Sequence, residues 1–265
     1  MEPIKPVKLW TRAYEALLQE IQSMEPGENR LPPEDEIAAA LQVSRATVRE
    51  AMHVLIAEGY VTRRQGKGIF AHPSALALKQ RIDFNTDFIT LLSNGEEQAV
   101  CRFLSSGYAA ASPVMKARFP EPCDQVYQQH WLYCRGEKPL ISCHISVPQA
   151  RLIKAPQLPR PNQNLLRWIL EYCHAEISYC ATHLLCSANE EAAQVLRLSD
   201  HCAMINWHEI LFDLSDRPTA FCNVFFHPEE VDLSMILPVN TKAQYSQRVG
   251  KASPDKPHDL GGETR

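Results

Sequence analysis

Residues 31–59 constrain the fold more than any other stretch, because they predict two short helices separated by a tight turn. Residues 34–41 place apolar side chains at helical spacing, and residues 42–44 supply the turn. Ser44 is expected to cap the next helix by accepting a hydrogen bond from a free backbone N–H. Gly59 then supplies the left-handed stop that ends this helix.

Further elements flank this helical pair. Residues 8–24 predict an amphipathic helix, with apolar residues at i, i+3, i+4 and i+7, and residues 26–27 (Pro-Gly) end it. Residues 60–71 predict a β-hairpin whose tip, residues 65–68, is rich in glycine. The buried side of the helix that follows Ser44 is formed by Val48, Ala51, Met52, Leu55 and Ile56.

The charge of this part of the chain is unevenly distributed. The whole chain has a net charge of −4, which by itself does not indicate a nucleic-acid binder. Residues 43–72, however, contain five Lys and Arg residues against two Glu, a net charge of +3. Most acidic residues of this half lie in the first helix and at the start of the second. One face can therefore be basic although the chain is acidic.

The helix after the turn offers candidate contacts to DNA. A helix fits the major groove, and its first turn lies closest to the base edges. Arg45 and Arg49, one turn apart, can each pair with guanine or grip a phosphate. Ala46 lets the backbone approach closely, and Thr47 lies on the other shoulder of the helix. Two exposed arginines commonly only solvate a helix face, so their significance depends on the order of the surrounding elements.

The hairpin offers a second group of contacts. Gln65, Gly66 and Lys67 at its tip suit a minor-groove or phosphate contact, since Gly66 exposes its N–H without a side chain in the way. Arg63 and Arg64 alternate across the strand, so at most one of them faces the duplex. We count Arg63 among the candidate contacts.

Residues 8–72 resemble the winged helix-turn-helix of the GntR family of bacterial repressors. The resemblance implies that Arg45, Thr47, Arg49 and Gly66 contact DNA. One departure is Pro33, where the family usually has a capping Ser; the cap is lost, but Pro is tolerated at a helix start. The matching motifs are Leu31-Pro32-x-Glu34, Ala38-x-x-Leu41, Val43-Ser44-Arg45-x-Thr47-Val48-Arg49-Glu50-Ala51, Leu55, Glu58-Gly59 and Arg63-x-Gln65-Gly66-x-Gly68-x-Phe70.

At 265 residues the chain is long enough for about two domains. After a DNA-binding domain over residues 1–72, we expect a linker over residues 73–82 and a second domain over residues 83–240. Residues 241–265 are rich in Lys, Ser, Pro and Gly, and we expect them to be disordered.

The second domain alternates between predicted helices and strands. Hairpins dominate, so we expect a mostly antiparallel sheet with helices on one face, an α+β fold. The predicted helices are residues 83–93, 164–174 and 190–198, and the predicted strands are residues 98–108, 123–134, 138–147, 177–187, 202–212 and 219–226.

This domain resembles the effector domain of the HutC-type branch of the family, known as UTRA and related in fold to chorismate lyase. The resemblance implies a small-molecule pocket whose occupancy alters the spacing of two DNA-binding heads in a homodimer. It is carried by the helix end Asn94-Gly95, the paired-strand pattern Val126…Pro139-Leu140…Val147-Pro148 and the hairpin at Arg217-Pro218.

The pocket positions depart from the pattern of relatives that bind sugar phosphates, which tend to be charged there. An aromatic, nearly uncharged pocket is expected, which does not favour a phosphorylated sugar. A shift of one residue would bring His130 or His144 into these positions, and the alternative is that the residues fill a core. The positions are occupied here by Trp131, Tyr133, Cys143, Ala220 and Phe226.

The sequence favours neither a metal site nor a cofactor. The nine cysteines are scattered and are interpreted as buried thiols. Cys180, His183 and Cys186 would share a helical face, but the segment predicts a strand, where His183 points away from the two cysteines. Asp213 and Asp216 lie in a turn, where Asp caps backbone groups. No nucleophile–base pair and no Gly-rich phosphate loop is found, so we expect no enzymatic activity.

No run approaches ~18 consecutive apolar residues and the N-terminus has no apolar signal region, so we expect no membrane span and cytoplasmic residence by default.

The sequence favours a dimeric, ligand-responsive repressor that binds a near-palindromic operator with half-sites about one helical turn (~34 Å) apart. Two alternatives stay open: an enzyme with lyase-type chemistry in the second domain, and a protein-interaction module that uses its winged helix without DNA.

Overall fold

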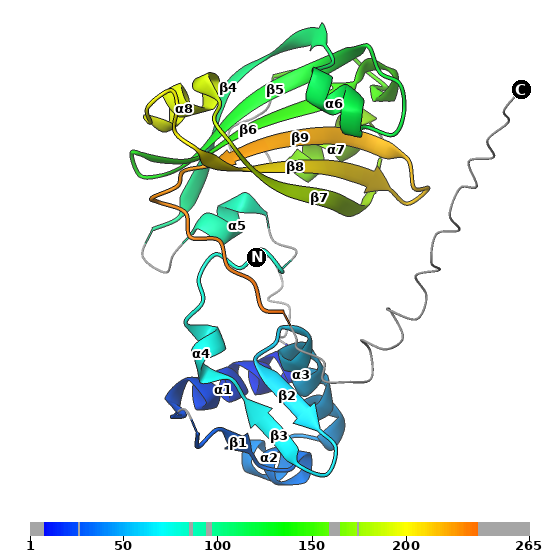
Figure 1. Ribbon diagram of the computed structural model, residues 1–265. Helices are drawn as coiled ribbons and strands as arrows, with labels where there is room; N and C mark the ends of the chain where they lie inside the picture. Colours follow the sequence, from blue (N-terminus) through cyan, green and yellow to red (C-terminus); the bar gives the residue numbers. More distant parts are fainter. Residues whose placement is uncertain are drawn as a thin grey trace, which may run out of the picture. The chain divides into compact units, whose positions relative to one another are not determined.

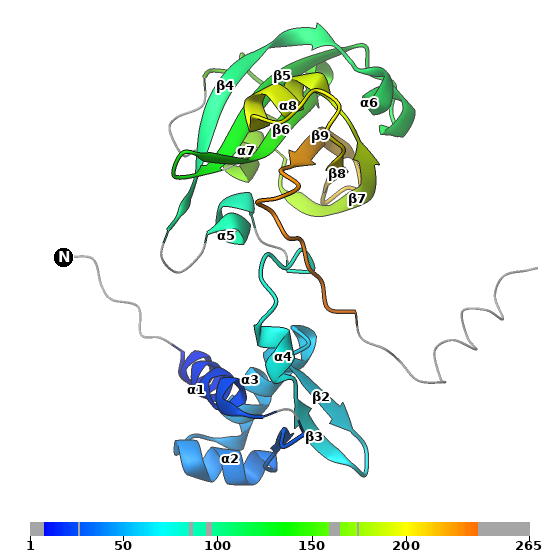
Figure 2. The same ribbon diagram turned by 60° about the vertical axis from the view of Figure 1, so that its left-hand side comes forward.

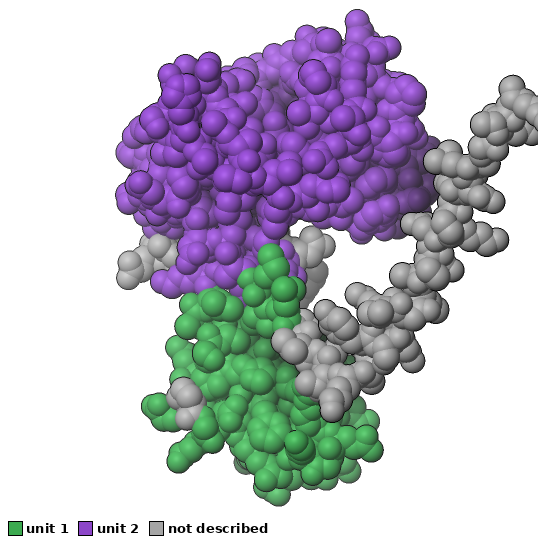
Figure 3. Space-filling model, viewed as in Figure 1, with its two compact units in different colours: residues 1–78, 235–265 green, residues 79–234 purple. Residues whose placement is uncertain are grey.

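A computed structural model describes residues 8–25, 27–84, 87–93, 97–158, 165–173 and 175–237. The chain divides into two compact units (Figure 3), one comprising Met1–Leu78 and Met235–Arg265 and the other Lys79–Ser234. The boundary falls inside the predicted linker, and residues 235–237 group with the first unit although we assigned them to the second domain. The tail predicted to be disordered, residues 241–265, lies outside the described residues. None of the described helices is long and apolar enough to span a bilayer.

The first unit is a small helical bundle with a three-stranded antiparallel sheet in the order β1-β3-β2 (Figure 1). The helix over residues 34–41 has the predicted bounds. The two-residue strand β1 was not predicted, because it is defined only by its pairing with the distant β3. The elements are α1 (Leu9–Ser23), β1 (Arg30–Leu31), α2 (Glu34–Leu41), α3 (Arg45–Ala57), β2 (Val61–Arg64), β3 (Gly68–Ala71) and α4 (Pro73–Leu76).

The core of this unit lies between α1, α2 and α3. From α1, the residues Ala13, Leu17 and Ile21 are buried at helical spacing, as the periodicity predicts. Tyr14 on the same helix donates a 2.6 Å hydrogen bond to the carboxylate of Glu58, just after α3. The apolar side of α3 therefore anchors this helix and leaves its opposite side to solvent. The buried residues of α3 are Val48, Ala51, Met52 and Leu55.

The second unit is built on a six-stranded sheet in the order β4-β5-β6-β9-β8-β7 (Figures 1 and 2). Every neighbouring pair is antiparallel, which confirms the α+β prediction. The elements are α5 (Phe88–Leu92), β4 (Ala99–Ala110), α6 (Pro113–Arg118), β5 (Gln125–Arg135), β6 (Lys138–Pro148), the 3₁₀-helix η1 (Gln149–Arg151), α7 (Leu165–Cys173), β7 (Ile177–Ser187), α8 (Glu190–Leu196), β8 (Met204–Asp213) and β9 (Pro218–Phe226).

Helices cover both faces of this sheet, so the expectation of helices on one face was wrong. On one face, Trp168 and Ile169 of α7 are buried in the largest apolar cluster. The helices α6 and α8 lie against the other face (Figure 2). Met115 of α6 packs on Phe221, and α8 packs on Phe225. The central strands carry buried residues on both sides, which is why both faces need cover.

Two helices of the second unit differ from the prediction for local reasons. The helix predicted over residues 83–93 spans only α5, because the carboxylate of Asp87 caps its start by accepting a 3.1 Å hydrogen bond from the N–H of Thr90. The helix α6 was not predicted. Its signal is the pair Ser112-Pro113, since Ser112 accepts a 3.1 Å hydrogen bond from the N–H of Met115 and Pro113 occupies the first helical position.

Candidate nucleic-acid interface

The first turn of α3 is held by the cap that the sequence predicts. The Ser44 hydroxyl oxygen accepts a 3.1 Å hydrogen bond from the N–H of Thr47, and the two hydroxyl oxygens lie 2.8 Å apart. Thr47 is half-buried and takes part in the cap, whereas Arg45, Ala46 and Arg49 are exposed. The positive end of the helix dipole lies at this same turn, where it favours a bound anion.

The hairpin of β2 and β3 presents an exposed tip beside α3. Residues 65–67 form the turn, closed by a 3.0 Å hydrogen bond from the N–H of Lys67 to the carbonyl oxygen of Arg64. Gly66 has a φ of +73°, a left-handed conformation that favours glycine, and its α-carbon faces open space. Gln65, Gly66 and Lys67 are all exposed, so the tip can approach a phosphate backbone closely.

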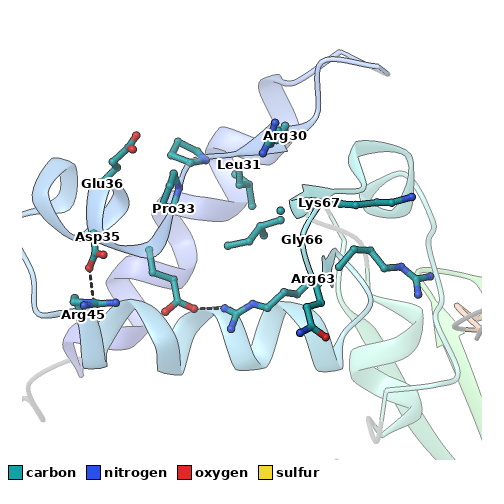
Figure 4. Close-up of a pocket in the computed structure, with 15 residues that line it drawn as sticks. Arg30, Leu31, Pro33, Asp35, Glu36, Arg45, Arg63, Gly66 and Lys67 are labelled. Carbon is teal, nitrogen blue, oxygen red and sulfur yellow. Dashed lines mark hydrogen bonds and ion pairs between the residues drawn. The ribbon is translucent and has the colours of Figure 1, made fainter.

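An open groove of about 700 Å³ lies between the start of α2, the start of α3 and the hairpin (Figure 4). Arg45 borders it from α3, Arg63 and Lys67 border it from the hairpin, and Arg30 borders it from β1. Basic side chains from three elements therefore face one concave surface.

Carboxylates from the first turn of α2 pair with these arginines. Asp35 forms an ion pair with Arg45 (Figure 4). Glu34 forms ion pairs with both Arg63 and Arg49, with 3.6 Å between its Oε2 and the Nε of Arg49. The Arg45 and Arg49 side chains nevertheless stay 63% and 58% exposed, while that of Glu34 is only 11% exposed. The carboxylate of Glu34 thus links Arg49 of α3 to Arg63 of the hairpin.

The exposed ion pair of Asp35 with Arg45 does not prevent an anion from binding. An exposed pair contributes only about 0–1 kcal/mol, because water screens it and two long side chains lose freedom. Exchanging the carboxylate of Asp35 for a DNA phosphate therefore costs little. We did not predict that Glu34 and Asp35 would form ion pairs with these arginines. Both lie in the first turn of α2, where the helix dipole favours acidic residues, and this position was the signal that the sequence offered.

The five predicted effector positions lie on one face of the second unit's sheet. Alternation along the strands puts them there, and His130 and His144 point to the opposite face. All five are buried, and all five contribute to the largest apolar cluster from β5, β6 and β9, as the core-filling alternative expects. The five are Trp131, Tyr133, Cys143, Ala220 and Phe226.

The same face also carries polar groups that we did not predict. Glu209 on β8 lies in register with Cys222 of β9, and burial raises the pKa of its carboxyl. Gln129 Nε2 and Trp168 Nε1 are buried and have no hydrogen-bond partner within the described part of the chain. We expected a nearly uncharged pocket, and that expectation did not include the carboxyl group of Glu209.

Two clusters behave as the sequence predicts. Residues 180–186 lie in the strand β7, which separates His183 from Cys180 and Cys186. Asp213 caps its turn by accepting hydrogen bonds from the N–H groups of Ser215 (2.8 Å) and Arg217 (3.0 Å). The Arg217 N–H is the largest influence that lowers the pKa of the Asp213 carboxyl.

Comparisons with known proteins support the interpretation of the first unit. Residues 9–71 match the family described as bacterial regulatory proteins, gntR family. A segment of 41 residues is 51% identical to the uncharacterized HTH-type transcriptional regulator YurK of Bacillus subtilis, and one of 45 residues is 56% identical to the uxu operon transcriptional regulator of Escherichia coli. Each match spans about 17% of this chain and 17% of the relative's length.

Two solved structures resemble the fold over most of the chain. The possible transcriptional regulator YydK from Bacillus subtilis has a TM-score of 0.62 at 15% identity, over 88% of this chain and 100% of that one. PhnF from Mycobacterium smegmatis has a TM-score of 0.52 at 16% identity, over 86% and 100%. At such identities the likeness concerns the fold alone.

Proposed function

We propose that this chain, whose residues 9–71 form a domain of the gntR family of bacterial regulatory proteins, is a ligand-responsive transcriptional regulator that binds double-stranded DNA. The observation that carries this proposal is the exposure of Arg45 and Arg49 at the capped start of α3, beside the glycine-rich hairpin tip. In this proposal α3 enters the major groove, and Gln65, Gly66 and Lys67 contact the backbone or the minor groove.

The regulator acts as a homodimer and a repressor in this proposal. Two copies of α3 then read a near-palindrome whose half-sites lie about one helical turn (~34 Å) apart. The second unit serves as an effector domain of the HutC-type, UTRA branch, and ligand binding there alters the spacing of the two DNA-binding domains.

Salt dependence tests the DNA-binding proposal. Each phosphate contact releases counterions, so a dimer that makes 6–10 such contacts should lose about 10³- to 10⁵-fold in affinity between 50 and 200 mM salt. The full-length chain is first used to select a site from a random duplex library, and binding is then measured by fluorescence anisotropy across this salt range. A protein-interaction module that does not use DNA would select no site, and binding indifferent to salt would contradict the proposal.

The effector surface in this proposal is the sheet face that carries Trp131, Tyr133 and Phe226. The carboxyl group of Glu209 lies on this face and, when ionised, repels phosphate, so the preferred ligand combines an aromatic or apolar body with a cationic or hydrogen-bond-donating group. The buried donors of Gln129 and Trp168 suit an acceptor atom on the same ligand.

A metabolite screen tests this chemistry. Thermal shifts of the full-length chain should be largest for cationic or neutral aromatic compounds, and the shift should shrink in Glu209→Gln because the carboxylate is lost. Asp200→Asn removes an equivalent charge from an exposed loop and serves as the matched control. A phosphorylated ligand whose shift is the same in Glu209→Gln as in the wild type would contradict this assignment.

A further inference from the structure

A row of imidazole rings crosses the sheet on the face opposite the proposed effector surface. His130 of β5 lies opposite His144 of β6, and His144 lies opposite Asn223 of β9. The row continues from Asn223 to His208 of β8 and from there to His183 of β7. Directly opposed residues on antiparallel strands point to the same side, so this row lies on the face that α6 and α8 cover.

Three potential metal ligands converge at one end of this row. The rings of His130 and His144 are stacked, with centroids 3.7 Å apart and planes 23° from parallel. Glu191 of α8 places one carboxylate oxygen 3.6 Å from His130 Nδ1 and the other 3.8 Å from His144 Nε2. One donor atom from each of the three residues lies within 4.8 Å of the other two.

The spacing of these atoms suits a metal ion better than direct contact. Hydrogen bonds between nitrogen and oxygen span about 2.7–3.2 Å, so both carboxylate–imidazole distances are too long. A tetrahedral zinc ion with bonds of 2.0–2.1 Å separates its ligand atoms by about 3.3 Å. Small side-chain rotations would bring the three donors to that separation.

The surrounding structure holds two of these donors in place. His130 is buried, and its Nε2 lies 2.9 Å from the hydroxyl oxygen of the buried Ser142, which leaves Nδ1 facing Glu191. Such a hydrogen bond to the second nitrogen orients metal-binding histidines in proteins. The helix α8 is capped by Asn189, whose side-chain oxygen accepts a 2.8 Å hydrogen bond from the N–H of Ala192. Glu191 therefore projects from a fixed helix start.

The histidines are suited to act as neutral ligands. Burial, and secondarily the neighbouring His144, lowers the pKa of His130 to about 4. Burial also lowers the pKa of His144, although Glu191 opposes that change. An ordinary ion pair with Glu191 would require a protonated imidazole. Neutral imidazole is the form that binds a metal ion, and burial favours that form in both rings.

We propose that His130, His144 and Glu191 bind a divalent transition-metal ion, with Zn²⁺ the ion best matched to two imidazoles and a carboxylate. The Glu191 side chain is 65% exposed, so the ion can enter from solvent. Three protein ligands leave a coordination position open. A bound ion would tie α8 to β5 and β6.

Metal titration of the full-length chain tests this site. The protein is stripped with EDTA, dialysed and titrated with ZnCl₂ by calorimetry, and we expect one ion per chain. Glu191→Gln keeps the shape of the side chain but loses a charged ligand, and it should weaken binding by at least about tenfold. Glu190→Gln removes the same charge from the adjacent exposed position and should bind as the wild type does. Equal affinities in the two variants would overturn the proposal.

The nine free cysteines require a spectroscopic control, since Cys180 and Cys186 are exposed. Titration with Co²⁺ distinguishes the two kinds of site, because thiolate ligands add strong near-ultraviolet charge-transfer absorption that imidazole and carboxylate ligands lack. We expect visible bands without that absorption. A thiolate signature, or the absence of saturable binding, would refute the site. Metal-free Glu191→Gln should unfold at the wild-type temperature, which excludes misfolding as the cause of lost binding.

Discussion

Replacing either Arg45 or Arg49 by alanine is expected to weaken binding to the selected DNA site by about 10- to 100-fold. Each guanidinium can form two parallel hydrogen bonds to a guanine edge or a charge-assisted contact to a phosphate, and losing such a contact costs about 1–3 kcal/mol. Both side chains are exposed at the start of α3, so their removal should leave the fold intact. Fluorescence anisotropy at constant salt measures the effect.

Two further variants separate this role from general charge. Arg12→Ala removes an exposed positive charge from α1 that does not line the groove, and it should change affinity little. Asp35→Asn removes the carboxylate that pairs with Arg45, so it should strengthen binding by a few-fold. Wild-type affinity in both Arg45→Ala and Arg49→Ala would contradict the proposed interface.

Truncating Leu55 to alanine is expected to destabilise the first unit by about 2–5 kcal/mol. Leu55 is fully buried on α3 at the centre of a small core, and the deletion leaves a cavity that a bundle of this size cannot readily fill. Natural domains are stable by only about 5–15 kcal/mol, so a substantial part of the stability would be lost.

Hydrogen exchange measures this loss within one unit of a two-unit chain. The backbone amides of α3 should exchange at least about 30-fold faster in Leu55→Ala, the factor that corresponds to 2 kcal/mol. His53→Ala changes an exposed residue on the same helix and should leave exchange nearly unchanged. Wild-type protection in Leu55→Ala would show that α3 does not depend on this core.

Local signals account for the parts of the fold that were predicted well. The cap at Ser44 and the positive φ of Gly59, +75°, depend on residues within one helical turn, so α2 and α3 could be placed from the sequence. The strands of the second unit were placed within a few residues because alternation and turn residues mark them. The exposure of Arg45 and Arg49 also follows from local periodicity, since the apolar residues of α3 define its opposite side.

Contacts between distant segments could not be placed in the same way. The strand β1 exists only through its pairing with β3, and the ion pairs of Glu34 join α2 to α3 and to the hairpin. The cover of both sheet faces depends on where each helix crosses the sheet, which no periodicity specifies.

The sequence by itself determined the helices α2 and α3 and the side of α3 that carries Arg45 and Arg49. It also determined the strand alternation that points His130 and Trp131 to opposite faces of the sheet. Only the tertiary structure decided which groups those side chains meet, because strand register and helix crossing bring together residues far apart in the chain. Register sets His130 opposite His144, and the packing of α8 adds Glu191 from some fifty residues further along. Local backbone periodicity decides which way each side chain points, whereas the groups that it contacts depend on how the whole chain packs to bury its core.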